Sequence, residues 1–183
     1  DFIAATATGS SRNTEQTTGA VVSYDQQVHP GILRIPADVG DLWDDLNNSR
    51  NTLFRDLPSS WSSIRLMISS FAPTVDYQQA GLVVYQDDDN YVQISRMYQA
   101  GNSIAFVREF NGTGQGLRTI NETTTTNIYL RLDRDQLTQN ITSYYSIDGI
   151  NWIQVGSVVR QLSNPRFAIF VGASPGGFPN ADI

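Results

Sequence analysis

Carboxylates are the side chains in this sequence best able to do acid–base chemistry. The chain has 18 acidic residues, one histidine, no cysteine and no lysine, so all 12 basic residues are arginine. It therefore offers no thiolate nucleophile, no zinc–thiolate site and no lysine Schiff base. His29 precedes Pro30-Gly31 in a predicted turn and has no placed triad partner. Glycoside hydrolysis by carboxylates and oxygen ligation of calcium stay open.

Two carboxylate pairs are candidates for hydrolysis. A retaining glycosidase needs two carboxyl groups about 5 to 5.5 Å apart, and the i, i+2 spacing of Asp133 and Asp135 suits that distance on one strand. These two residues nevertheless occur where a predicted strand runs into a polar turn, which would leave both solvated and ordinarily acidic. A cross-strand pair of Glu109 with Asp133 is the other possibility. The sequence favours a protein without catalytic residues, with hydrolysis as the second hypothesis.

Runs of aspartate in predicted loops are the candidate metal ligands. Asp87, Asp88 and Asp89 precede Asn90, and calcium prefers oxygen ligands of this kind. The same composition suits a hairpin turn whose charges prevent edge association of the sheet. A second acidic cluster with the same two readings contains Asp38, Asp41, Asp44 and Asp45. We expect no cofactor, with structural Ca²⁺ as the open alternative.

Strands must position these side chains, because alternating and β-branched runs separated by turn residues dominate the sequence. The turn signal is strongest at Asp148-Gly149. The segment Asp38–Asp56 is predicted to be a loop with one helical turn. The fold class predicted is all-β, an antiparallel two-sheet β-sandwich. Its candidate strands are Gly31–Ile35, Ser63–Phe71, Gln79–Gln86, Tyr91–Tyr98, Ser103–Phe110, Asn127–Asp133, Asn140–Ile147, Trp152–Ser157 and Arg166–Gly172.

Alternation within the strands predicts which residues face the core. The inward set is Ile64, Leu66, Ile68, Val92, Ile94, Ile104, Phe106, Phe110, Ile128, Leu130 and Leu132. The remaining aromatic residues expected in the core or at its edge are Trp61, Trp152, Phe167 and Phe170.

The opposite faces carry polar and aromatic residues that suit sugar recognition. Sugar rings stack on aromatic planes, and their hydroxyls pair with planar polar groups. The predicted outward row is Gln79, Tyr91, Gln93, Tyr129, Arg131 and Asp133. Near strand ends or in loops, Trp43, Arg96, Arg108 and Glu109 complete the candidate ligand-binding set. An ordinary exposed sheet surface has a similar composition.

Three stretches resemble the concanavalin A-like sandwich modules of the DUF1349 type. They are Leu33-Arg34-Ile35-Pro36 with Gly40-Asp41-Leu42-Trp43, Tyr77–Val92 (YQQAGLVVYQDDDNYV) and Tyr144–Trp152 (YYSIDGINW). From about Gly31 to Gly172 the chain is also similar, more distantly, to the C-terminal β-sandwich domains of family 43 β-xylosidases. The resemblance implies a jelly roll, usually one module of a larger secreted protein that acts on or binds carbohydrate. The resemblance does not assign a catalytic role to any residue of this sequence.

The whole chain, residues 1–183, is expected to be one β-sandwich module, with residues 1–20 as a weakly ordered lead-in and the module cut from a larger protein. A net charge of −6 argues against nucleic acid, and no apolar run is long enough to span a membrane. Sequons at Asn47, Asn111, Asn121 and Asn140 arise by chance or by glycosylation of a secreted protein. We expect a secreted, non-catalytic carbohydrate-binding module that partners neighbouring domains. The alternatives are a glycoside hydrolase and a structural or adhesion spacer.

Overall fold

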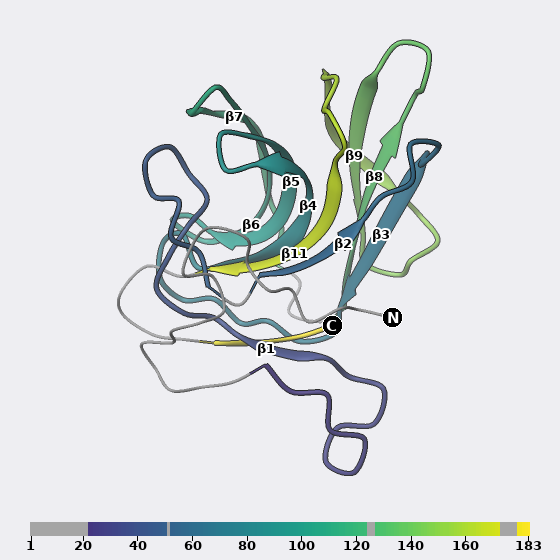
Figure 1. Cartoon of the computed structure of the whole chain (residues 1–183). Helices are drawn as coiled ribbons and strands as arrows, with labels where there is room; N and C mark the ends of the chain where they lie inside the picture. Colours follow the sequence, from purple (N-terminus) through teal and green to yellow (C-terminus); the bar gives the residue numbers. More distant parts are fainter. Residues whose placement is uncertain (1–21, 51, 124–126, 173–178) are drawn as a thin grey trace.

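The computed structural model describes residues 22–50, 52–123, 127–172 and 179–183, and its regular elements there are all β-strands (Figure 1). In chain order the strands are β1 (Arg34–Pro36), β2 (Leu53–Asp56), β3 (Ser63–Ile68), β4 (Gln79–Asp87), β5 (Asn90–Tyr98), β6 (Asn102–Phe110), β7 (Thr113–Asn121), β8 (Ile128–Arg134), β9 (Asn140–Ser146), β10 (Ile153–Val159), β11 (Arg166–Gly172) and β12 (Asn180–Asp182). No helix in these ranges is long and apolar enough to cross a lipid bilayer. The predicted lead-in of residues 1–20 lies outside the described residues.

The strands form two principal sheets and a small third one. The larger sheet has the order β2-β11-β4-β5-β6-β7, the smaller one the order β10-β9-β8-β3, and β1 pairs with β12. All of the pairings between strands are antiparallel. The predicted all-β, antiparallel two-sheet sandwich is therefore confirmed.

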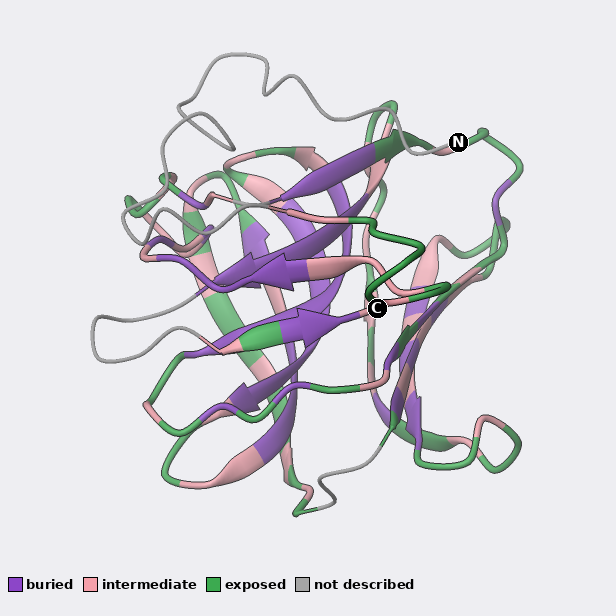
Figure 2. Ribbon diagram, turned by 90° about the horizontal axis from the view of Figure 1, so that it is seen from below, coloured by how far each residue is buried: buried purple, intermediate pink, exposed green. Residues whose placement is uncertain are grey.

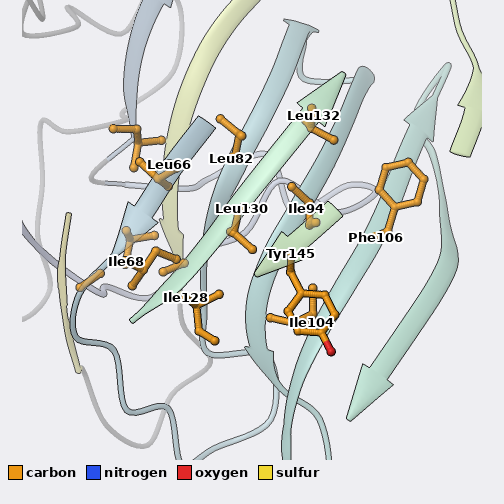
Figure 3. Close-up of a cluster of buried hydrophobic side chains, with 14 of the residues drawn as sticks. Leu66, Ile68, Leu82, Ile94, Ile104, Phe106, Ile128, Leu130, Leu132 and Tyr145 are labelled. Atoms are coloured by element: carbon orange, nitrogen blue, oxygen red, sulfur yellow. The ribbon is translucent and has the colours of Figure 1, made fainter. Parts of the chain in front are cut away.

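The main hydrophobic core fills the space between the two large sheets (Figure 3). Leu82, Ile94 and Phe106 from the larger sheet are fully buried, as are Leu130 and Leu132 from β8. Buried segments run mainly along the strands, and exposed residues lie mainly in the connecting loops (Figure 2). Alternation thus identified the core because successive strand residues point to opposite faces.

Two aromatic residues depart from the expected core. Phe110, at the end of β6, is 44% exposed. Trp152 does not belong to the core; its ring lies against the guanidinium groups of Arg131 and Arg65. Since Arg131 alternates with the core residues of β8, this stack occupies the face of the smaller sheet turned away from the larger one.

Three observed strands, β2, β7 and the three-residue β12, are not among the predicted ones. The strand β7 has the sequence Thr-Gly-Gln-Gly-Leu-Arg-Thr-Ile-Asn and is largely exposed. Because it is rich in glycine and polar residues, it lacks the composition by which strands are usually predicted. It forms because the tight turn at Asn111-Gly112, where both residues have positive φ, folds it back along β6. The strand β2 lies inside the predicted loop Asp38–Asp56 and pairs with β11 at the sheet edge.

The first part of that predicted loop, Asp38–Asn48, crosses the larger sheet on the face turned away from the core. We call this the outer face, and we call residues Asp38–Asn48 the roof loop. A second apolar cluster packs Leu42 of the roof loop against residues of β2, β4, β5 and β11, which are Phe54, Val83, Tyr85, Tyr91, Ala168 and Phe170. The outward-pointing residues of β5 are consequently not solvated, since Tyr91, Gln93 and Ser95 are at most 2% exposed.

Candidate ligand-binding site

A cavity of about 660 Å³ lies between the roof loop and the outer face of the larger sheet. This volume falls within the usual range of small-molecule sites, roughly 300 to 1,000 Å³. The roof loop contributes Val39, Gly40, Asp41, Trp43, Leu46 and Asn48. The strands and their ends contribute Tyr77, Gln79, Tyr91, Gln93, Met97, Gln99, Val107, Gly116 and Thr119.

Amide side chains form a fixed polar network in the floor of this cavity. Gln93 Nε2 donates to Gln79 Oε1 at 2.7 Å, and Ser95 Oγ donates to the same oxygen at 3.2 Å. Gln79 Nε2 in turn donates to both carboxylate oxygens of Asp41 at 3.3 Å. Strand register places these residues together. Gly81 on β4 pairs with Ser95 on β5, and Gln79 and Gln93 lie on the same face, one on either side of this pair. The network fixes which atom of Gln79 is the donor and which is the acceptor.

Asp41 connects the amide network to the roof loop. Its Oδ1 accepts a hydrogen bond from the backbone N–H of Leu42 at 2.7 Å. Burial raises the pKa of Asp41 to about 6, although the backbone N–H groups of Leu42 and Trp43 and the amide of Gln79 oppose this change. At neutral pH the group is therefore mostly ionised, and in mildly acidic solution it also becomes a hydrogen-bond donor.

Glu109 holds the roof loop on the sheet from below. Its Oε2 accepts the backbone N–H of Asp44 at 2.9 Å, and it lies 3.2 Å from the hydroxyl of Tyr91. That hydroxyl also lies 3.1 Å from the carbonyl oxygen of Leu42. Glu109 is fully buried, and burial raises its pKa. It does not line the cavity, so in this structure it anchors the loop rather than facing a ligand.

Trp43 is fixed at the edge of the roof by a close approach to β7. The neighbouring Asp44 adopts φ 49°, and its carboxylate accepts the N–H of Gly114 at 2.6 Å. A Cβ at Gly114 would lie only 2.6 Å from Cε2 of Trp43. Glycine is thus required at this position of β7 for the indole to occupy its place.

Four of the predicted ligand-binding residues line the cavity, and two others have a different place. Trp43, Gln79, Tyr91 and Gln93 are lining residues. Arg96 pairs with Ile104 across β5 and β6 and is buried on the core-facing side, because it alternates with the outer-face residues of β5. Arg108 lies on the same side and donates to Gln115 Oε1. The expectation that these two arginines sit beside the row is therefore wrong.

The predicted single row of ligand-binding residues is also wrong in its second half. Tyr129, Arg131 and Asp133 belong to β8, a strand of the smaller sheet, whereas Gln79 and Gln93 belong to the larger one. Asp133 contacts Ser63 Oγ at 2.7 Å and Arg131 Nε at 3.1 Å. The hypothetical catalytic pair of Glu109 with Asp133 is excluded by the same topology, because each residue lies on the face of its own sheet turned away from the core, and the core lies between them.

Sequence reasoning missed several of the cavity's lining residues. The sequence marks Asp41 only as a member of an acidic cluster, and nothing in it marks Tyr77, Asn48 or Gln99 as site residues. Asn48 comes from a loop, while Tyr77 and Gln99 flank strand ends. No periodic signal marks such positions. The useful signal in the sequence was alternation, which placed Gln79 and Gln93 on the outward side of their strands.

The aspartates proposed as calcium ligands make separate contacts in a turn. Asp87 Oδ1 accepts from the backbone of Asp89 and the amide of Asn90, while Asp88 accepts from the hydroxyl of Tyr85. Within the described ranges, no three His, Asp or Glu side chains gather in a way that could hold a metal ion. Calcium binding stays a prediction from sequence.

Comparison with known proteins gives one family and several solved structures of similar fold. The sequence model of the β-xylosidase C-terminal concanavalin A-like domain matches residues 12–179. The GH43 protein BlXynB from Bacillus licheniformis superposes with a TM-score of 0.75 at 24% identity, over 87% of this chain and 33% of that chain. Xylan β-1,4-xylosidase from Bacillus halodurans gives a TM-score of 0.71 at 16% identity, over 86% and 32%. A functionally unknown protein from Saccharomyces cerevisiae gives 0.66 at 14% identity, over 92% and 88%.

The chain thus spans about a third of the length of the two bacterial proteins. No curated protein sequence matches it. At these identities the structural likeness shows the fold, and it confirms the concanavalin A-like sandwich expected from the sequence.

Proposed function

Because the chain belongs to the family of β-xylosidase C-terminal concanavalin A-like domains, we propose that it is a non-catalytic module that binds carbohydrate in the cavity beneath the roof loop. The proposal includes a neighbouring catalytic domain as partner, since the bacterial proteins of this fold are about three times longer. It also includes secretion, which the exposed sequon residues Asn111 and Asn121 support.

The observation that carries the proposal is the combination of aromatic and amide groups in one cavity. Trp43 and Tyr77, which both line the cavity and are partly exposed, supply flat surfaces on which the C–H face of a sugar ring can stack. Gln79 and Gln93 supply amide groups already held in one orientation by their mutual hydrogen bond. Groups fixed before binding lose little conformational entropy on binding, which favours affinity.

The carboxylates near the cavity support binding more than hydrolysis. Among the residues that line the cavity, Asp41 is the single carboxylate. A retaining or inverting glycosidase uses two carboxyl groups on either side of the scissile bond. Glu109 is fully buried behind Tyr91 and already accepts hydrogen bonds from the roof loop. It would have to leave these partners to reach a substrate.

Isothermal titration calorimetry against xylan, glucan, fructan and mannan oligosaccharides tests this function. We expect one class to bind, and we expect Trp43→Ala and Gln93→Ala each to weaken binding by at least about tenfold, which corresponds to about 1.4 kcal/mol. Trp152→Ala is the matched control, because Trp152 lies on the smaller sheet, and it should leave affinity unchanged. Absence of binding to every class, or equal losses for Trp43→Ala and Trp152→Ala, would refute the proposal. Reducing-sugar release by the purified chain would favour the hydrolase instead.

A further inference from the structure

The cavity beneath the roof loop contains a negative charge that no basic side chain of its lining balances. Asp41 is the only charged residue among the described residues that line the cavity, whose other polar side chains carry amide, hydroxyl or indole groups. Its carboxylate accepts hydrogen bonds from neutral donors, the backbone N–H of Leu42 at 2.7 Å and Gln79 Nε2 at 3.3 Å. These bonds orient the carboxylate but leave its charge in place.

Two further carboxylates add to the negative potential at the wall of this cavity. Burial raises the pKa of the Tyr91 hydroxyl, and the charges of three carboxylates raise it further, those of Glu109, Asp41 and Asp44. Tyr91 lines the cavity, so all three charges act on the same wall. A cleft whose charges have one sign focuses their field, because its walls have a low dielectric constant.

The arginines of the neighbouring strands do not oppose this potential from inside the cavity. Strands β4 to β7 form the floor, and the arginines that they carry are Arg96, Arg108 and Arg118. All three lie on the core-facing side, and Arg118 pairs there with the core residue Phe106. Arg166 of β11 lies on the outer face, but it stacks on Phe54 and Tyr85 of the second apolar cluster and does not line the cavity.

We propose that the charge of Asp41 makes this cavity select sugars without an acidic group, so that the ligand is an uncharged oligosaccharide and uronic-acid residues are excluded. This selectivity rests on the proposed carbohydrate-binding function and specifies its class of ligand. A neutral sugar brings no charge to the cavity, whereas a uronate carboxylate meets the like charge of Asp41. For two unit charges about 8 Å apart at an effective dielectric constant of about 20, the repulsion lowers affinity by more than about tenfold. Repulsion of the wrong ligand is a general source of specificity.

Calorimetry with a matched pair of ligands tests the proposal. The pair is the shortest neutral oligosaccharide that binds and the same oligosaccharide with glucuronic acid in place of one residue, because a short ligand keeps every residue near Asp41. At pH 7.5 the acidic sugar should bind the wild type at least about tenfold more weakly.

Two substitutions in the roof loop separate charge from size. In Asp41→Asn the difference between the two sugars should shrink by about fivefold or more, because a steric penalty would persist in this variant and the charge repulsion would not. Asp45→Asn is the matched control. Asp45 is an exposed residue of the same loop outside the cavity lining, so solvent screens its charge and the difference should stay as in the wild type.

The pH dependence of the wild type provides a second test that needs no variant. Lowering the pH from 7.5 to 5 protonates Asp41, whose pKa burial raises to about 6, while the carboxyl group of glucuronic acid stays ionised. Glu109 acts in the same direction, since burial also raises its pKa. The affinity ratio of the neutral to the acidic sugar should therefore be smaller at pH 5 than at pH 7.5.

The outcomes separate this selectivity from carbohydrate binding itself. If no oligosaccharide binds, the proposed function and the charge selectivity both fail. If the neutral and the acidic sugar bind the wild type equally at pH 7.5, or if their difference is unchanged in Asp41→Asn or at pH 5, carbohydrate binding stands and the charge selectivity is refuted.

Discussion

Asp41 behaves differently from the other aspartates because of where the roof loop places it. Burial beneath the loop raises its pKa to about 6. The pKa of Asp148 is instead held well below its usual range by hydrogen bonds from Asn151, Ile150 and Ser146 in an exposed turn. Residue type is the same in both cases, so the environment decides the acidity.

This difference predicts how stability depends on pH. The folded state keeps a proton on Asp41 between about pH 4 and pH 6, where the unfolded chain has released it. The free energy of unfolding should therefore fall as pH rises through this window, by about 1 to 2 kcal/mol for a partly exposed group, and level off above it. Urea unfolding at pH 4, 5, 6 and 7 measures the slope.

Asp41→Asn provides the control for this pH dependence. Asparagine keeps an oxygen acceptor for the Leu42 N–H but does not titrate, so the slope should become smaller. A remaining slope of the same sign is expected from Glu109, whose pKa is also raised. An unchanged slope in Asp41→Asn would contradict the assignment.

At the scale of elements, β7 and the roof loop determine each other's position. The loop rests on β7 through the hydrogen bond from the Gly114 N–H to Asp44 and through the contact of Trp43 with the Gly114 backbone. The polar, glycine-rich sequence of β7 makes it a weak strand by itself, and this same composition leaves room for the indole. The glycine residues of this edge strand therefore lower its strand propensity but allow close contact with the loop.

Gly114→Ala tests this contact. The new methyl group would overlap the Trp43 ring, so we expect a loss of about 1 to 3 kcal/mol in the free energy of unfolding. Displacement of the indole should also weaken sugar binding. Gly116→Ala is the matched control, since it lies on the same strand and its Cβ would meet nothing within 4 Å. Its stability should stay within about 0.5 kcal/mol of wild type. Equal destabilisation by both substitutions would mean that the Trp43 contact is not responsible.

At the scale of the whole molecule, the sandwich separates two polar and aromatic surfaces that the sequence predicted as one. One surface is the cavity on the larger sheet. The other is the stack on the smaller sheet, in which the guanidinium of Arg131 lies 4.2 Å from the ring centre of Tyr144 and 4.3 Å from that of Trp152. The hydrophobic core lies between them, so a change on one surface should not affect the other.

Arg131→Ala tests this separation. Loss of the two cation–π contacts and of the ion pair with Asp133 should lower the free energy of unfolding by about 1 to 2 kcal/mol. Affinity for the oligosaccharide identified by calorimetry should stay within about twofold of wild type. Gln93→Ala should show weaker binding. If Arg131→Ala reduces affinity as strongly as Gln93→Ala, the ligand also contacts the smaller sheet.

The sequence by itself determined the class of fold and much of the local geometry. Alternation of apolar residues identified the core faces of β3, β5, β6 and β8, because side chains alternate across a strand whatever the sheet contains. The bounds of Arg166–Gly172 were predicted as observed. The sequence also placed Gln79 and Gln93 in one outward row and marked Trp43 as an aromatic residue in a polar loop.

Only the tertiary structure decided which sheet each strand joins and what covers its outer face. Tyr91 and Tyr129 both alternate with the core residues of their strands and were predicted in one outward row. The strands that carry them, β5 and β8, belong to different sheets. The roof loop then buries Tyr91, encloses the cavity and raises the pKa of Asp41. Residue periodicity is a property of a single strand, whereas sheet order and loop placement depend on contacts between residues far apart in the chain. For that reason the sequence predicted the chemical groups of the site, and the fold selected which of them meet.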